Sequence, residues 1–278
     1  MAGPQIRTPR LRLIALAAPG LAALGFFFIL PLAVVAGEAF AGDAFARFLA
    51  SADLIGALGR SLLLGIGAGG VSLVVGIAVA LHLSRLPPAR RALLQLVIAL
   101  PLTFSGLIIA YGFILVLGRA GFVTLLLAEI GVDPGQVAAL LYGPAGLVMA
   151  YAYYLTPRVV LMLLPVFANF DQRQIDAAES MGAGRARALI DILAPQVAPT
   201  AFAAFCLVAA VAIGTYGTAL ALVGTQLDIL PLRLYSMVAD AGADFPLAAA
   251  TSIVLLATCS LLMGVAEVVA ARAESRHV

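Results

Sequence analysis

SLLLGIGAGGVSLVVGIAVALHL, residues 61–83, contains no Asp, Glu, Lys or Arg. A helix needs about 20 apolar residues to cross a bilayer, and this run is long enough. Five more apolar runs lie at 13–37, 92–118, 138–160, 197–223 and 247–270, and among them only 138–160, with Arg158, and 247–270, with Glu267, contain a charged residue. Hydrophobic residues make up 63% of the 278-residue chain and charged residues 11%, whereas soluble domains are about 45–50% apolar and about 25% charged. We predict an all-α membrane bundle of six transmembrane helices, with residues 1–278 forming one domain.

The first run has a second interpretation, because Arg7, Arg10 and Arg12 stand in front of it as they do in a signal peptide. The apolar part of a signal peptide is only about 7–15 residues long. The run at 13–37 is much longer, and we therefore favour a transmembrane helix that is retained.

The arginines predict the orientation of the spans, since Arg and Lys are enriched in cytoplasmic loops. With both termini in the cytoplasm, twelve arginines lie inside: Arg7, Arg10, Arg12, Arg85, Arg90, Arg91, Arg158, Arg173, Arg185, Arg187, Arg272 and Arg276. Four lie outside: Arg47, Arg60, Arg119 and Arg233. We predict a multi-pass membrane protein with cytoplasmic N- and C-termini, in contact with membrane lipid.

The charged residues within or next to the runs, Glu38, Arg158 and Glu267, are predicted to reach an end of their span. An ion-coupled carrier usually needs an ionisable group at membrane depth. The sequence therefore favours a transport protein that takes its energy from another chain.

Several function classes are excluded by composition. The chain has no Lys, so it cannot form a P-loop and is not a P-loop ATPase. Its net charge of +2 argues against nucleic-acid binding. Cys206 and Cys259 lie in apolar runs and no Cys/His cluster has metal-ligand spacing, so we predict no metal, no cofactor and no enzymatic activity.

Two polar segments interrupt the apolar pattern. Residues 119–137 are too short to span a bilayer, and we expect one short helix lying at the outer face. Residues 166–195, VFANFDQRQIDAAESMGAGRARALIDILAP, read as two short cytoplasmic helices. Asp171 and Gln174 have the spacing of a capping box, and Gly182 stands where a left-handed residue ends a helix. Gly184 opens the second helix, which Pro195 is expected to end before the fifth span.

This loop resembles the EAA motif of the permease subunits of binding-protein-dependent ABC importers. The usual form is E-A-A, three residues, Gly, nine residues and I-x-L-P. The chain reads D-A-A-E-S-M-G at 176–182, then nine residues, then I-L-A-P at 192–195. Asp176 replaces Glu, and Ala194 replaces the usual Leu. The loop precedes the penultimate span, as it does in the family.

The resemblance implies a type I importer permease fold and three protein partners. These are a cytoplasmic ABC ATP-binding subunit, a second permease subunit that makes a homo- or heterodimer, and an extracytoplasmic solute-binding protein. It also implies that the loop docks on the ATP-binding subunit. The residues expected at that interface are Asp176, Ala177, Ala178, Glu179, Met181, Gly182, Ala183, Arg185, Ile192 and Pro195. Among them, Ala177 and Ala178 are expected to pack in the ATPase cleft, and Gly182 to make the turn.

The polar residues of the fifth span and its end are candidates for a translocation path: Thr215, Tyr216, Thr218, Thr225 and Gln226. The alternative is that they make hydrogen bonds between helices. The tail GTYGTALALVG (214–224) is similar to the subgroup that serves polyamines, ferric ion, thiamine, sulfate and phosphonates.

The expected solute is therefore a small polar or charged molecule of these classes. Eight acids on the outer side favour a cation at the mouth: Glu38, Asp43, Asp53, Glu129, Asp133, Asp228, Asp240 and Asp244. The competing functions are an ion-coupled secondary transporter or channel, and a membrane scaffold that transports nothing.

Overall fold

The computed structural model describes residues 10–224, 226–239 and 244–274, and every regular element in these ranges is helical. The elements of the first half are α1 (Arg10–Leu24), η1 (Gly25–Ile29), α2 (Leu30–Ala39), α3 (Ala44–Ala50), α4 (Ala52–Ser84), α5 (Pro88–Ala99), η2 (Leu100–Thr103), α6 (Gly106–Leu117), α7 (Phe122–Glu129) and α8 (Pro134–Leu141). Those of the second half are α9 (Pro144–Ala168), α10 (Arg173–Ser180), α11 (Arg185–Ala188), η3 (Leu189–Leu193), α12 (Ala194–Gly214), α13 (Gly217–Val223), α14 (Leu230–Ala239) and α15 (Phe245–Glu274).

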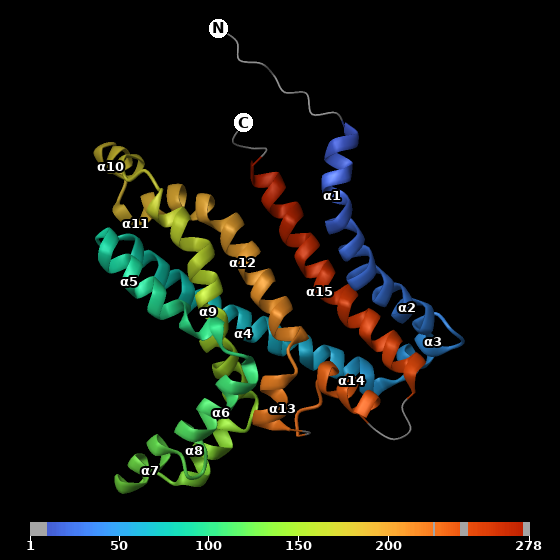
Figure 1. The fold of residues 1–278 in the computed structure, drawn as a ribbon. Coiled ribbons are helices and arrows are strands. Elements are labelled where there is room, and N and C mark those ends of the chain that lie inside the picture. The colour runs from blue at the N-terminus through green and yellow to red at the C-terminus, as the bar shows by residue number, and fades with distance from the viewer. Residues whose placement is uncertain (1–9, 225, 240–243, 275–278) are drawn as a thin grey trace.

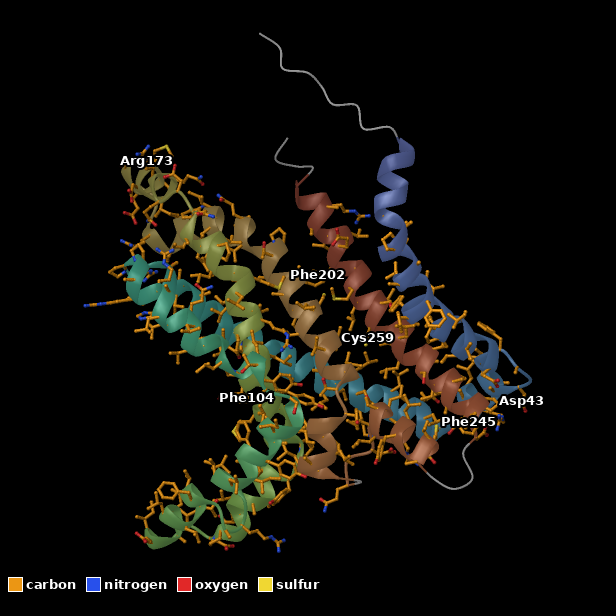
Figure 2. All side chains as sticks on the ribbon, in the orientation of Figure 1. Asp43, Phe104, Arg173, Phe202, Phe245 and Cys259 are labelled. Carbon is orange, nitrogen blue, oxygen red and sulfur yellow. The ribbon has the colours of Figure 1, made fainter. Side chains whose placement is uncertain are left out.

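Figure 1 shows α4, α9 and α12 crossing one another in the middle of the molecule, with α15 and α1–α2 on one side and α5–α8 and α13 on the other. Residues 170–188, which contain α10 and α11, form a bend at one end that we call the elbow. The first turn of α1 and the last turn of α15 point toward that same end. The helices α3 and α14 lie at the opposite end, as the labels of Arg173 and Asp43 show in Figure 2.

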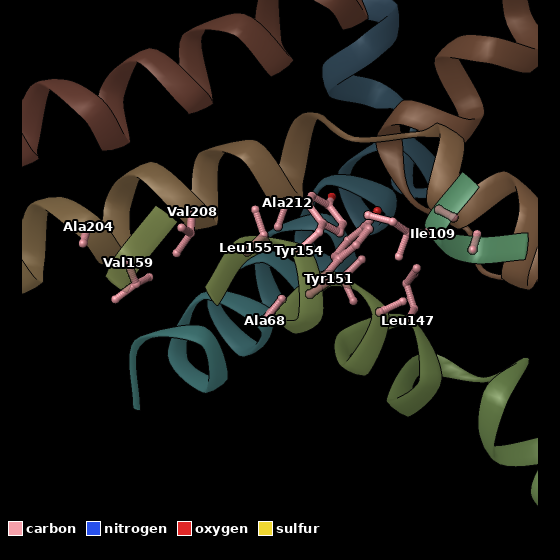
Figure 3. Packing of buried hydrophobic residues seen from close by; sticks show 14 of the residues in the cluster. Ala68, Ile109, Leu147, Tyr151, Tyr154, Leu155, Val159, Ala204, Val208 and Ala212 are labelled. Atoms are coloured by element: carbon pink, nitrogen blue, oxygen red, sulfur yellow. The ribbon is translucent and has the colours of Figure 1, made fainter. Parts of the chain in front are cut away.

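The central helices approach closely because α4 carries glycines where it meets its neighbours. A Cβ built on Gly76 would stand 2.5 Å from Cγ1 of Val159 in α9, and one built on Gly65 would collide with Ile213 in α12. Around these contacts lies the main apolar core, which includes Tyr151, Tyr154 and Leu155 of α9 (Figure 3). Without Cβ atoms at these points, the helices gain dispersion contacts along their whole crossing.

Six segments are long and apolar enough to cross a membrane, as the sequence predicts: Ala17–Ala39, Ala52–Ser84, Gly106–Glu129, Pro144–Ala168, Arg185–Gly214 and Phe245–Arg272. Three predicted spans are wrong in detail. The predicted helix 92–118 is broken between α5 and α6 at η2, where Pro101 removes a backbone donor. The predicted 138–160 helix instead runs from Pro144 to Ala168, and the predicted 197–223 helix ends at Gly214.

The prediction that Pro195 ends a helix is also wrong, because Arg185–Gly214 form one continuous helix. A π-helical turn at Leu189–Leu193 precedes the proline, and the N–H of Ala194 donates to the carbonyl of Leu189, five residues back. The same arrangement precedes Pro31 in the first span, where the N–H of Leu30 donates to Gly25. The wider turn accommodates the proline, because the proline ring and its missing N–H do not fit the interior of a regular α-helix.

The end opposite the elbow is held by ion pairs between segments far apart in sequence. Asp228 pairs with Arg233 and, at 2.5 Å, with Arg60 of α4, whose Nε also donates to the Asp228 carbonyl at 2.6 Å. Arg47 pairs with Asp43 and Asp244. The hydrogen bond from Arg233, and to a lesser degree the charge of Arg60, hold the pKa of Asp228 below its ordinary value. Asp228 therefore stays ionised and the pairing persists at neutral pH.

Residues 119–137 form two short helices, α7 and α8, and not the single helix that the sequence predicts. Gly131 separates them with a φ of +89°. Asp133 then starts α8, because its side chain accepts a hydrogen bond from the N–H of Gly135 at 2.9 Å.

The glycine contacts of α4 give a matched test. Gly76→Ala forces the new methyl group against the β-branched Val159, so we expect a loss of about 1–3 kcal/mol in the free energy of unfolding. Gly67→Ala is the control, because a Cβ there meets nothing within 4 Å and alanine favours helix by up to about 1 kcal/mol. Thermal unfolding of the two variants in detergent should give opposite shifts. Equal melting temperatures would show that the α4–α9 crossing is loosely packed.

Candidate functional site

The elbow is closed by a left-handed glycine, as the sequence predicts. Gly182 has a φ of +88°. Its N–H donates to the carbonyl of Glu179 at 3.0 Å, and the N–H of Ala183 donates to the carbonyl of Ala178 at 3.0 Å. These two bonds form a Schellman motif, which satisfies the carbonyls that the end of α10 leaves free. Gly184 then starts α11 in an extended conformation. The elbow is therefore a fixed turn between two helices.

The start of α10 differs from the prediction, because no capping box forms. The Asp171 carboxylate accepts a hydrogen bond from the N–H of Arg173 at 3.0 Å. The amide of Gln174 turns away and accepts a hydrogen bond from Gln196 in the first turn of α12, at 2.8 Å. The side chain expected to cap α10 instead ties the elbow to α12.

The elbow has a small apolar core of its own, made by Ile175, Ala178 and Ala188, with Phe170 and Ile192 at its edge. Ala178 is only 8% exposed, so it faces this core and not the surface. Sequence reasoning grouped it with Ala177 because the two are adjacent in the motif. On a helix, neighbours in sequence point in different directions.

The other residues predicted for a partner surface divide by exposure. Those that lie on the surface are Asp176, Ala177, Glu179, Met181, Gly182, Arg185 and Pro195, while Ala183 and Ile192 are half-buried. Met181 stands at the tip of the elbow and is 83% exposed. The exposed thioether gives this tip an apolar centre, and charged side chains of both signs, such as Glu179 and Arg185, lie on the surface around it.

The predicted path residues lie around a break in the fifth span and not inside a continuous helix. The chain leaves α12 at Gly214 and enters α13 at Gly217. Thr215 Oγ1 donates to the carbonyl of Val211 at 2.6 Å, and the Thr215 carbonyl accepts from the Tyr151 hydroxyl at 2.8 Å. Tyr216 is exposed and stacks on Tyr235 with ring centroids 5.6 Å apart.

Thr218 is fully buried, and its Oγ1 has no hydrogen-bond partner in the described part of the chain. It lies against the first residue of α6, because a Cβ on Gly106 would collide with Thr218 Oγ1. The start of α6 and the break that follows α12 therefore lie against each other. Gln226 lies apart from this group, on an open depression of about 800 Å³ beside α6 and α8. Thr225 lies outside the described residues.

Sequence reasoning missed the residues of α9 that face these breaks. Tyr151 holds the backbone of Thr215, and the Tyr154 side chain lies beside those of Thr215 and Thr218. Arg158, expected near the cytoplasmic surface, lies within the span because α9 continues for ten more residues to Ala168. The signal was available in the sequence, since residues 159–170 between Arg158 and Asp171 carry no charge.

Six apolar segments long enough to cross a membrane, with an elbow before the fifth, define a polytopic membrane protein. The fold matches a chain of a bacterial ABC transporter involved in the import of the acidic polysaccharide alginate, with a TM-score of 0.74 and 20% identity over 94% of this chain and 96% of that one.

The chain belongs to the family described as binding-protein-dependent transport system inner membrane component, whose model matches residues 72–275. It is 26% identical to the spermidine/putrescine transport system permease protein PotB of Haemophilus influenzae over 52% of this chain and 51% of that one. It is 25% identical to the ferric transport system permease protein FbpB of Actinobacillus pleuropneumoniae over 79% of this chain.

A third relative is the putative 2-aminoethylphosphonate transport system permease protein PhnU of Salmonella typhi, 24% identical over 78% of this chain and 77% of that one. The chain spans about half the length of PotB and about a third of FbpB.

Gly182 and Gly184 give a matched test of the elbow, since a Cβ on either meets nothing within 4 Å. Gly182→Ala forces an L-residue to a φ of +88°, which costs about 1–2 kcal/mol. Gly184→Ala has an ordinary φ of −68° and serves as the control. We expect faster amide hydrogen exchange at residues 182 and 183 in the first variant only. Unchanged protection in Gly182→Ala would show that the Schellman bonds do not hold the turn.

Proposed function

We propose that this chain is the permease subunit of an ATP-driven importer in a bacterial inner membrane. In this role it forms the path of a small polar or charged solute such as a polyamine, ferric ion, thiamine or a phosphonate. It works with a second permease subunit and with an extracytoplasmic solute-binding protein. A separate cytoplasmic ATP-binding subunit hydrolyses ATP, and both termini of this chain lie on that side.

The observation that carries the proposal is the elbow. It has its own core, a fixed glycine turn and an exposed Met181 at its tip. It follows α9 directly and continues without interruption into the helix Arg185–Gly214. A rigid knob joined to two spans transmits a push into the membrane, whereas a flexible loop would absorb it. Such a knob suits docking in a groove of a soluble partner.

Arg158 places a charge within a span, but this charge does not support an ion-coupled carrier. A guanidinium stays protonated at all physiological pH values, so it cannot carry a proton across the cycle. Among the described residues, no acid pairs with it. The energy for uphill transport is therefore expected from ATP hydrolysis by the partner.

Reconstitution in proteoliposomes tests the proposal. Uptake of the solute should require ATP and all four components: this chain, the second permease, the ATP-binding subunit and the binding protein. The omission of any one should abolish uptake. Uptake by this chain alone under an ion gradient would establish the carrier or channel, and an elbow that binds a cytosolic protein without any uptake would establish the scaffold.

The elbow surface makes a sharper prediction. Ala177→Arg adds a large charged side chain at an exposed position without entering the elbow core, so the protein should fold normally. We expect ATPase stimulation and uptake to fall by about tenfold or more, as when a charge is placed in a packed interface. Ala89→Arg, also exposed and outside the elbow, is the control and should transport normally. Normal uptake by Ala177→Arg would show that this surface of the elbow does not contact the ATP-binding subunit.

A further inference from the structure

Arg158 lies deep within its span. It stands ten residues before the end of α9 and fourteen after its start, which correspond to about 15 Å and about 21 Å along the helix axis. The nearest charged residues in sequence are Asp133 and Asp171, both outside α9. A charge in the middle of a membrane helix costs about 2.5–3.5 kcal/mol on insertion scales, and such residues usually face a solute path or a water-filled cavity.

The side chain of Arg158 folds back along α9 onto Tyr154. Its Nη1 donates to the carbonyl of Tyr154 at 3.1 Å, and its Cζ lies 5.9 Å from the centroid of the Tyr154 ring. No other hydrogen bond and no ion pair involves this guanidinium within the described residues. Since a guanidinium has five N–H donors, most of its capacity is left for a group outside the chain.

Two hydroxyls beside it are also without partners. The Tyr154 side chain is 6% exposed and that of Thr218 is 0% exposed, and neither oxygen makes a hydrogen bond within the described residues. A buried hydroxyl without a partner costs about 1–3 kcal/mol. Tyr154 packs on Tyr151 with ring centroids 5.8 Å apart, and the Tyr151 hydroxyl donates to the carbonyl of Thr215, three residues before Thr218, at 2.8 Å. Tyr154 therefore links Arg158 to Thr218, and we treat the guanidinium and the two hydroxyls as one group of donors.

The first turn of α6 adds positive potential at the same place. Gly106 lies against Thr218, and Gly106–Leu117 is a helix of 12 residues that starts there. In that first turn, the N–H of Ile108 donates to the side chain of Ser105 at 3.4 Å. Among the described residues, no other N–H of this turn has a side-chain partner. The N-terminal end of a helix favours an anion.

We infer that Arg158, together with the hydroxyls of Tyr154 and Thr218, holds a negatively charged oxygen group of the solute as it crosses the membrane. The inference rests on the transport function proposed above and narrows its solute to molecules that carry a phosphonate, sulfate or carboxylate group. A fixed positive charge at this depth opposes a solute that is only a cation, such as a polyamine.

The acids at the opposite end from the elbow do not contradict an anionic solute. Asp228 is paired with Arg60 and Arg233, and both Asp43 and Asp244 are paired with Arg47. Three of the eight acids that favour a cation by sequence are therefore engaged by arginines in the structure, whereas Arg158 has no acid partner among the described residues.

The first experiment identifies the solute. The companion binding protein is titrated with inorganic sulfate, 2-aminoethylphosphonate, spermidine and thiamine, and the wild-type assembly is tested for ATP-dependent uptake of the ligand that binds. We expect a ligand with a negatively charged oxygen group. Uptake of spermidine or thiamine would overturn the anion site and leave the importer intact, whereas a wild-type assembly with no ATP-dependent uptake would overturn the proposed function itself.

The second experiment uses variants of Arg158 in the same proteoliposomes. Arg158→Gln should lower uptake by about tenfold to a hundredfold, the effect of losing a hydrogen bond to a charged group. Arg158→Lys should keep part of the uptake, because it keeps the positive charge. Arg90→Gln, an exposed arginine at the start of α5, is the matched control. Wild-type uptake by Arg158→Gln, or equal uptake by Arg158→Lys and Arg158→Gln, would overturn the inference.

Thr218→Val separates a solute contact from a structural role. Because valine has nearly the same shape and removes an unpartnered hydroxyl, a purely structural position should become no less stable and should transport normally. The inference predicts an unchanged or raised melting temperature with uptake lowered several-fold. Full uptake by Thr218→Val would remove this hydroxyl from the solute site and overturn the group of donors proposed here.

Discussion

The close crossing of α4, α9 and α12 is the constraint on which the rest of the structure depends. Water gives no hydrophobic drive between helices inside a bilayer, so these helices associate through packing. Gly65 and Gly76 bring α4 so close to Ile213 and Val159 that a single methyl group does not fit. This contact fixes the direction of α9 and α12, and with it the positions of the elbow at one end and of the breaks near the middle.

Proline has two different effects in this chain. At Pro31 and Pro195 a preceding π-helical turn lets the helix continue, whereas at Pro101 the helix stops and a new one begins at Gly106. The continuous helix after the elbow and the break between α5 and α6 have different consequences. In the proposed importer, the continuous helix transmits a displacement from the elbow, and the break frees backbone donors that protein or solute must cover.

The number of spans and the glycine turn of the elbow could be predicted from the sequence, because hydrophobic length and a left-handed glycine are local signals. The break at Thr215 could not, since it depends on which side chains fill the space after the helix ends, whereas Pro101 marks the break between α5 and α6. Arg158 was misplaced for a related reason. A shift of α9 by a few residues, set by Gly143 and Pro144, moves an arginine from the edge of a span to its interior.

The two candidate sites are connected by the same pair of helices. The elbow joins α9 to α12, and Tyr154 and Arg158 lie on α9 while Thr218 follows the end of α12. In the proposed importer, a push on the elbow therefore acts on both sides of the solute group at once. Coupling then requires only a small change in the distance between α9 and α13, because a charge-assisted hydrogen bond weakens steeply with distance and angle.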